Sequence, residues 1–187
     1  KVQIEDTSLP GVVVLTPARH GDARGFFSES WNAARMKDAG LDLTFVQDNH
    51  SMSEKAGTLR GLHFQSPPHA QGKLVRCGRG AIFDVAVDAR VGSPTYGEWA
   101  GVELSFENGR QLLVPEGFLH GFVTLQPMSE ICYKCTDHYA PECDGAVKWD
   151  SCGIEWPVPM EDLVISPKDD AAQAFADFES PFKRSAP

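Results

Sequence analysis

The sequence predicts a mainly β protein of the sandwich or barrel type, and two features carry that prediction. The 17 glycines and 13 prolines are spread evenly along the 187 residues and separate short runs rich in Val, Ile, Leu, Phe and Thr. Many short strands between regular turn signals are typical of a sandwich or barrel. The stretches 76–80 and 107–109 contain Gly and Asn, which tolerate the positive φ of tight turns. We expect one β-rich domain over residues 1–187.

The predicted strands follow one another through short connections. Most are runs of β-forming residues that lie between turn-forming residues. In chain order they are Val12–Thr16, Gly25–Trp31, Thr44–Ser51, Thr58–Gln65, Lys73–Cys77, Gly80–Asp88, Trp99–Ser105, Gln111–Val114, Gly121–Leu125, Glu130–Tyr139 and Ala146–Trp149.

A few short helices are also predicted, notably near the C-terminus. The first spans Asn32–Ala39, because it starts with a favoured N-cap residue and is followed by Gly40, a favoured residue just past a helix end. The second begins at Ser166, with Pro167 in the first helical position and acidic residues in the first turn. It is expected to continue through Ala171–Phe178.

Composition excludes several classes of protein. Seventeen Lys and Arg against 26 Asp and Glu give a net charge of −9, whereas nucleic-acid-binding proteins usually present a basic face. The hydrophobic fraction of 42% is too high for a disordered chain. No apolar run approaches the roughly 20 residues of a membrane span, and Lys1–Asp6 lacks the apolar stretch of a secretory signal. We expect a cytoplasmic protein with no nucleic-acid or membrane partner.

The number of cysteines also favours a cytoplasmic location. Five cysteines are an odd number in an acidic chain of this size, which favours reduced thiols over a disulfide framework. Cys132 and Cys135 have the spacing of a zinc-ligand pair. The segment around them looks extended, however, and strand positions three apart point to opposite faces. Since the sequence has no second such pair, buried free thiols are the preferred interpretation.

Two clusters of residues resemble a known pair of motifs. In the first, His63 and Gln65 follow a glycine, and in the second, residues 115–120 read Pro-x-Gly-x-x-His. These clusters resemble the two cupin motifs, which lie on neighbouring strands of a small double-sheet barrel. The resemblance implies a cupin-type jelly-roll barrel with His63 and His120 at its mouth.

The first motif departs from the metal-binding pattern. Gln65 stands at the position of the second histidine, and the glutamate that normally follows is missing. A metal cupin brings about three or four nitrogen and oxygen ligands to one ion. His63 and His120 supply two, and His69 lies in a Pro-Pro turn. The sequence therefore predicts no metal and no cofactor, and it leaves two histidines for acid–base chemistry or substrate contact.

A longer series of strings narrows the resemblance to one family. The strings are Asp22-x-Arg24-Gly25-x-Phe27-x-Glu29, Gln47-Asp48-Asn49-His50-Ser51, Arg60-Gly61-Leu62-His63-Phe64-Gln65, Gln71-Gly72-Lys73-Leu74-Val75, Asp84-Val85-Ala86-Val87-Asp88-x-Arg90, Gly92-Ser93-Pro94-Thr95-Tyr96-Gly97 and Val114-Pro115-x-Gly117-Phe118-x-His120-Gly121-Phe122. From about Gly11 to Asp169 the chain resembles the dTDP-4-dehydrorhamnose 3,5-epimerases, metal-free cupins of the dTDP-L-rhamnose pathway. The resemblance implies epimerisation at C3 and C5 of dTDP-4-dehydro-6-deoxy-D-glucose, which gives dTDP-4-dehydro-L-rhamnose.

The chemistry implied by the resemblance suits the residue types. The C4 ketone acidifies the protons on C3 and C5, so the reaction needs a base on one face and an acid on the other. By resemblance His63 is the base, and Tyr133 is the acid, with an ordinary pKa of about 10. Lys73 matches the residue that stabilises the enolate oxygen. Asp169 matches the partner of the base, although Asp170 would serve equally well on residue type.

The resemblance also assigns substrate-binding positions. They are Arg24, Glu29, Gln47, Asn49, Arg60, Lys73, His120, Tyr139, Asp144 and Lys168. Arginine suits bidentate binding of a diphosphate, and Tyr139 matches an aromatic residue that stacks on thymine. Asp144 stands where the family often has a glutamate. Strand alternation would put Arg60 and His63 on opposite faces, unless Gly57 and Gly61 permit a bulge.

The resemblance implies a homodimer whose N-terminal strands are exchanged, so that the segment 24–29 serves the site of the partner.

Other functions remain open on the sequence. One is an epimerase acting at C3 only or C5 only, or a 3,4-ketoisomerase of a related dTDP-deoxysugar pathway. Another is a non-catalytic sugar-binding cupin or a metal-dependent cupin oxygenase.

Overall fold

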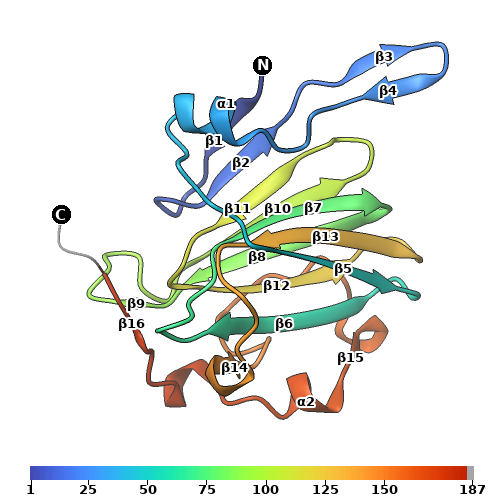
Figure 1. The fold of residues 1–187 in the computed structure, drawn as a ribbon. Helices are drawn as coiled ribbons and strands as arrows, with labels where there is room; N and C mark the ends of the chain where they lie inside the picture. Colours follow the sequence, from blue (N-terminus) through green and yellow to red (C-terminus); the bar gives the residue numbers. More distant parts are fainter. Residues whose placement is uncertain (185–187) are drawn as a thin grey trace.

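The computed structural model describes residues 1–184 as two six-stranded sheets that face each other (Figure 1). The first sheet has the order β1-β2-β11-β7-β13-β5. Its strands are β1 (Gln3–Asp6), β2 (Val13–Thr16), β11 (Gln111–Val114), β7 (Lys73–Arg79), β13 (Ser129–Cys135) and β5 (Gln47–Ser53). Every pair of neighbours in this sheet is antiparallel.

The second sheet has the order β10-β8-β12-β6-β14, and β15 pairs in parallel with β6. Its strands are β10 (Trp99–Ser105), β8 (Ala81–Asp88), β12 (Phe118–Thr124), β6 (Thr58–Gln65), β14 (Asp144–Ala146) and β15 (Val164–Ile165). Two small pairs lie outside the sheets: β3 (His20–Asp22) with β4 (Gly25–Phe27), and β9 (Arg90–Val91) with β16 (Phe182–Lys183). The helices are α1 (Ala33–Asp38), α2 (Pro167–Asp170), and three short 3-10 helices at Pro141–Cys143, Met160–Asp162 and Phe175–Asp177.

The main core lies between the two sheets. Its buried side chains come from alternate positions of the facing strands, as the period of two in a strand requires. Examples are Val75 and Ile131 from the first sheet, and Ile82, Ala86 and Phe122 from the second. Burial of these side chains holds the sheets face to face, and polar residues at the same inward positions are therefore brought into one space.

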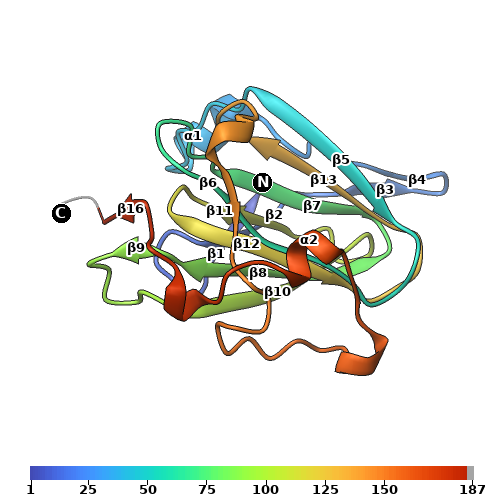
Figure 2. The same ribbon diagram turned by 90° about the horizontal axis from the view of Figure 1, so that it is seen from below.

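The outer faces of the sheets are covered by the two ends of the chain. Met36 of α1 and the residues before it pack on Leu15, Leu74 and Leu113 of the first sheet. The segment after β14 lies across the second sheet, as the orange and red ribbon in Figure 2 shows. This segment buries Phe178 and other side chains against Val85 and its neighbours. As a result, the second sheet has side chains packed on both faces.

The prediction of a mainly β fold with few helices is confirmed. Strands Thr58–Gln65, Trp99–Ser105 and Gln111–Val114 have the predicted bounds. The structure also confirms α1, with Asn32 as its N-cap and Gly40 at a φ of 95° just beyond its end.

Several predicted elements are wrong in extent, and among them the last predicted strand, Ala146–Trp149, overlaps the observed β14 (Asp144–Ala146) at one residue only. The predicted strand Gly25–Trp31 ends at Phe27, and the predicted strand Glu130–Tyr139 ends at Cys135. The helix expected through Ala171–Phe178 stops at Asp170, because Phe175 and Phe178 turn into the apolar cluster on the second sheet. Over residues 1–184, no helix has both the length and the apolar character that crossing a bilayer demands.

Candidate active site

The candidate site lies between the two sheets, where polar side chains take inward positions beside the core. Tyr133 on β13 packs partly against the inter-sheet cluster, so its side chain points inward. Asn49 on β5 pairs directly with Tyr133, and Gln47 pairs with Cys135. Directly paired residues share a face of the sheet. Three of the predicted site residues on the first sheet therefore face the same interior.

Strand β6 carries a bulge that turns two further site residues inward. Simple alternation would put Arg60 and His63 on opposite faces. In the register with β12, however, one residue opposes both Gly61 and Leu62, so Arg60 and His63 face the same side. Gly61 has a φ of 131°, and a Cβ there would lie 2.6 Å from a backbone atom of β12. The bulge thus requires glycine, and it resolves the conflict that alternation predicts.

His63 is held by a carboxylate. Its Nε2 lies 2.7 Å from Asp169 Oδ1, and the Gly61 N–H donates to Asp169 Oδ2 at 3.1 Å. Burial raises the pKa of Asp169, but the hydrogen bonds from His63 and Gly61 outweigh it, so the pKa lies below its ordinary value. The ionised carboxylate accepts the Nε2 hydrogen and leaves Nδ1 of the imidazole as the basic nitrogen.

The structure distinguishes the two neighbouring aspartates of α2. Ser166 accepts a hydrogen bond from the Asp169 N–H at 3.1 Å and caps the helix. This orientation buries Asp169 beneath β6, where it reaches His63. Asp170 points elsewhere and accepts from Nε1 of Trp149 at 3.4 Å. Asp169 is therefore the aspartate that pairs with the imidazole.

A second imidazole lies beside the first. His120 on β12 pairs in register with His63, so the two rings are cross-strand neighbours on one face. His120 Nε2 lies 2.6 Å from Asp84 Oδ1 on β8, and both side chains are buried. The other oxygen of this carboxylate, Asp84 Oδ2, is buried and has no hydrogen-bond partner among residues 1–184. The interior thus contains two imidazole–carboxylate pairs.

The first sheet supplies a cation and a phenol. Lys73 on β7 is buried, and its Nζ lies 5.8 Å from the centre of the Tyr133 ring. Burial lowers the pKa of Lys73, which nearby acidic groups, among them Asp84, only partly offset. Burial raises the pKa of Tyr133, and a hydrogen bond with Asn49 and the charge of Arg60 only partly offset it. Tyr133 therefore stays protonated, and able to donate, at neutral pH.

The remaining predicted residues form the rim of the site. Arg60 donates to Ser53 Oγ at 3.2 Å, and Lys168 lies 3.5 Å from Asp144. A cavity of about 440 Å³ lies beside Arg60, His63, Lys168 and Asp169. It is a size that suits part of a nucleotide sugar. Cations thus line a hollow in a chain whose net charge is −9.

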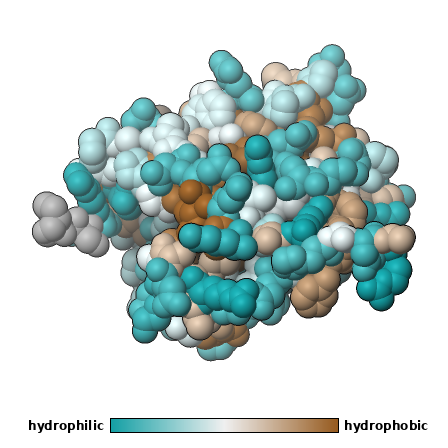
Figure 3. All heavy atoms as spheres, turned by 90° about the horizontal axis from the view of Figure 1, so that it is seen from above, coloured by the Kyte–Doolittle hydropathy of each residue, from teal (hydrophilic) through white to brown (hydrophobic). Residues whose placement is uncertain are grey.

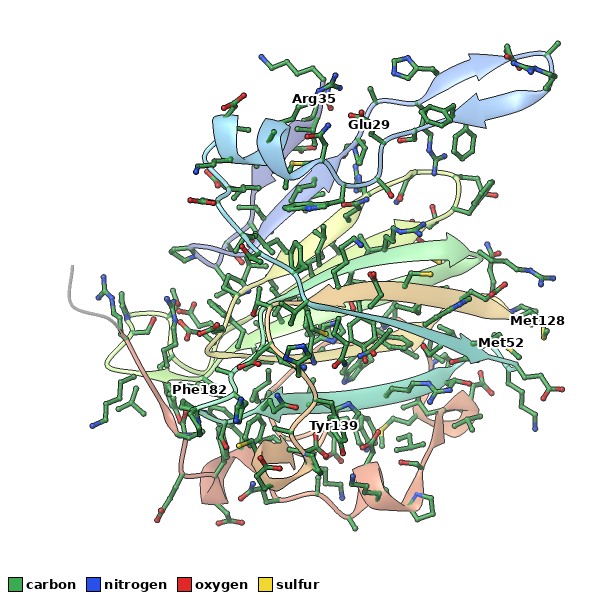
Figure 4. All side chains as sticks on the ribbon, in the orientation of Figure 1. Glu29, Arg35, Met52, Met128, Tyr139 and Phe182 are labelled. Atoms are coloured by element: carbon green, nitrogen blue, oxygen red, sulfur yellow. The ribbon has the colours of Figure 1, made fainter. Side chains whose placement is uncertain are left out.

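Tyr139 stands at the same rim, in the loop between β13 and β14 (Figure 4). The residue is 59% exposed. The Tyr139 N–H donates to Gln47 Oε1 at 2.9 Å, and Gln47 Nε2 donates to Asn49 Oδ1 at 3.1 Å. The side-chain amides of β5 therefore hold the backbone of the loop that carries this exposed residue.

Two predicted site residues lie apart from the others. Arg24 is exposed on the β3–β4 arm and pairs with Asp22, while Glu29 pairs with Arg35 beside α1. In Figure 4, Glu29 and Tyr139 lie on opposite sides of the molecule. One chain therefore does not bring Arg24 and Glu29 to His63, although the resemblance places all of them in one site.

The arm borders a hollow of its own. It has a volume of about 810 Å³ and is lined partly by Val2, Phe27, Glu29, Arg35 and Met36. Figure 3 views the molecule from this side and shows hydrophobic atoms gathered among hydrophilic ones. This hollow is larger than the one beside His63, but within residues 1–184 its lining contains no imidazole–carboxylate pair. The chemistry therefore points to the inter-sheet site.

Two residues that bear on the site were not predicted. Asp84 interrupts the apolar run of β8, and a charged residue in such a run was the available signal. Gln65 replaces a metal-ligating histidine of the cupin motif and is buried with its amide fully hydrogen-bonded.

Within residues 1–184, no group of three or more His, Cys, Asp or Glu side chains is placed to hold a metal ion.

The cysteines have the arrangement expected of free thiols. Cys135 is buried on the inward face of β13, opposite Gln47, whereas Cys132 pairs with the exposed His50 on the other face. All five cysteines are free. The prediction that Cys132 and Cys135 point to opposite sides is confirmed.

Comparisons with known proteins agree on one family. The family model for dTDP-4-dehydrorhamnose 3,5-epimerase matches residues 6–177. The Salmonella typhimurium protein of that name is 55% identical over 154 residues, which are 81% of this chain and 84% of the relative. The Sinorhizobium fredii protein of that name is 48% identical over 185 residues, which are 98% and 94% of the two chains.

A solved structure is similar over its whole length. It is the dTDP-6-deoxy-D-glucose-3,5-epimerase of Legionella pneumophila in complex with dTDP-4-keto-L-rhamnose. The two chains are 43% identical and superpose with a TM-score of 0.94, with all of each chain covered. A match of this extent includes both sheets and the C-terminal segment that carries Asp169.

Proposed function

The chain belongs to the dTDP-4-dehydrorhamnose 3,5-epimerase family, and from this premise we propose how its own residues carry out the reaction. It is an isomerase of dTDP-L-rhamnose biosynthesis, which inverts C3 and C5 of dTDP-4-dehydro-6-deoxy-D-glucose. The proposal assigns the base to His63 and the acid to Tyr133. The reaction runs without a metal or a cofactor.

The first step is proton removal from the carbon next to the ketone. Nδ1 of His63 takes the proton, and Asp169, ionised by its lowered pKa, stabilises the imidazolium that forms. The electron pair of the broken C–H bond moves to the C4 oxygen. Lys73 stabilises the resulting enolate, because a fixed positive charge in a poorly solvated site interacts strongly with developing negative charge.

The second step returns a proton to the same carbon from the other face. Tyr133 lies on the opposite sheet from His63 and is protonated, so it can donate to the enolate carbon. The tyrosinate that forms lies near Lys73 and Arg60, whose charges favour it. Proton exchange with solvent then restores both side chains. The same sequence of steps at C3 and at C5 gives the double epimer.

Other residues bind the nucleotide sugar and hold its reacting carbon between His63 and Tyr133. Arg60 and Lys168 bind the diphosphate, because they are the cations that line the cavity beside His63. His120, held by Asp84, contacts the sugar. Tyr139 stacks on the pyrimidine with its exposed ring. Gln47, Asn49 and Asp144 complete the polar contacts of the rim.

Two residues require a second chain. Arg24 and Glu29 lie far from the site of their own protomer, and the exposed β3–β4 arm that carries Arg24 projects from the molecule (Figure 1). We place them in the site of a partner in a homodimer. An arm with Phe26 and Phe27 exposed is consistent with burial against a second copy.

We further propose a single domain over residues 1–187 and a cytoplasmic location.

The single observation that carries the assignment is the pair of His63 and Asp169 opening onto the interior that Tyr133 and Lys73 share. The test is incubation with dTDP-4-dehydro-6-deoxy-D-glucose in deuterium oxide, followed by NMR of the product. The expected result is deuterium at both C3 and C5, with exchange abolished in His63→Asn. Exchange at one carbon alone would establish a mono-epimerase. Unaltered substrate, with neither carbon exchanged, would refute the proposal.

A further inference from the structure

The loop that carries Tyr139 is held by side-chain amides. Gln65 Nε2 donates to His69 O at 2.6 Å and to His138 O at 2.9 Å. Gln65 Oε1 accepts from the Ala140 N–H at 3.0 Å. One side chain therefore bonds to the backbone on both sides of Tyr139, and also to the loop after β6.

Gln65 is suited to this position by its chemistry. It is 4% exposed, and each amide hydrogen and the amide oxygen has a backbone partner. A glutamate of the same shape would accept from Ala140 but would face two carbonyl oxygens without a hydrogen to donate. Asparagine is one methylene shorter. Only the glutamine amide provides two donors and one acceptor at this distance from β6.

The backbone at Tyr139 itself is held by another glutamine. Gln47 Oε1 accepts from its N–H at 2.9 Å, so three consecutive residues are fixed by side-chain amides. Tyr139 as a whole, by contrast, is 59% exposed. The direction of the ring over the rim therefore depends mainly on the backbone that Gln65 and Gln47 hold.

We propose that Gln65 is a positioning residue for the nucleotide. It stands where a metal-binding cupin has its second histidine, and it uses this inward position to set the loop that presents Tyr139 to a pyrimidine nucleoside diphosphate. It does not contact the substrate. The inference rests on the proposed function, in which Tyr139 stacks on the base.

The test compares binding and turnover in Gln65→Glu and Gln65→Met. Binding of dTDP is measured by isothermal titration calorimetry, and KM and kcat are measured with the dTDP-4-keto sugar. Both variants are expected to weaken dTDP binding and raise KM by about 10-fold, while kcat changes less than about twofold. Stacking of one base on an aromatic ring is large enough to account for such a loss. A fall in kcat with unchanged KM would overturn the proposal.

A double-mutant cycle tests whether Gln65 acts through Tyr139. In a Tyr139→Ala background, Gln65→Met is expected to weaken dTDP binding less than about twofold further, because the ring that it positions is gone. Independent effects that multiply would overturn the proposal. Gln71→Met is the matched control: Gln71 also donates to this loop, at Asp137 O (2.9 Å), but not beside the ring. It should leave dTDP binding within twofold of the wild type.

The outcomes separate this inference from the function on which it rests. If the wild type does not bind dTDP, the proposed function fails. If the wild type binds dTDP and folded Gln65 variants bind it equally well, the positioning role fails and the function stands. If both variants lose the cooperative thermal unfolding of the wild type, Gln65 is required for folding and the positioning role is likewise rejected.

Discussion

The two imidazole–carboxylate pairs of the interior differ in access. His63 lies 2.7 Å from Asp169 and His120 lies 2.6 Å from Asp84, so the contacts are nearly equal. The His63 side chain is 42% exposed, whereas that of His120 is 7% exposed. Asp169 accepts a second hydrogen bond, from Gly61, whereas Asp84 Oδ2 accepts none in the described part of the chain. We propose that the two pairs serve different purposes: the open pair exchanges a proton with the substrate, and the buried pair holds an imidazole that contacts the sugar.

The largest expected effect is on the open pair. We predict that His63→Asn lowers kcat about 10³-fold, because general-base catalysis contributes about 10²- to 10⁴-fold. Its thermal stability should stay close to that of the wild type, since the ring is half exposed. His69→Asn is the control, because His69 also pairs with a carboxylate, Asp137, at 3.2 Å. The test is a steady-state measurement of kcat for both variants, and an equal loss of kcat in the two would contradict the role of His63.

A smaller loss is expected when the carboxylate of the open pair is replaced. Asp169→Asn should lower kcat about 10²-fold, since an amide no longer stabilises the imidazolium or fixes the tautomer that leaves Nδ1 free. Asp170→Asn should change kcat less than about twofold, because Asp170 bonds Trp149 instead. Measuring both variants with the same substrate tests the distinction, which fails if Asp170→Asn is the more damaging.

The buried pair should contribute more to stability. Asp84→Ala is predicted to lower the free energy of unfolding by about 3 kcal/mol, because it leaves His120 buried without its partner. Asp169→Ala should cost about 1 kcal/mol, since water can reach the half-exposed His63. Urea denaturation followed by circular dichroism measures both values. Equal losses would remove the distinction between the two pairs.

The smallest effect concerns pH. The pKa of Asp169 is lower in the folded protein, so its contribution to stability is fully present above the ordinary value of about 4 and disappears as the pH falls through the lowered value. The difference in unfolding free energy between the wild type and Asp169→Asn should therefore shrink below about pH 4. Urea titrations between about pH 2.5 and 6 test this, and a difference that grows on acidification would have the wrong sign.

Several features of the fold and site followed from local sequence. Strand Thr58–Gln65 and helix α1 were predictable, because their turn residues, alternation and caps act within a few residues. The family resemblance likewise predicted His63 and Tyr133 as site residues. The short strands β1 and β16 were missed, because two to four residues carry little periodic signal before their partners are known.

The sequence by itself determined that the chain is a cupin-type β protein, and its family resemblance predicted an imidazole and a phenol for proton transfer. The tertiary structure decided which groups meet. Whether Arg60 and His63 share a face depends on the bulge at Gly61, and the choice of Asp169 over Asp170 depends on how a segment more than 100 residues away in sequence packs beneath β6. Such contacts are set by the packing of elements distant in the chain, which local preferences do not encode.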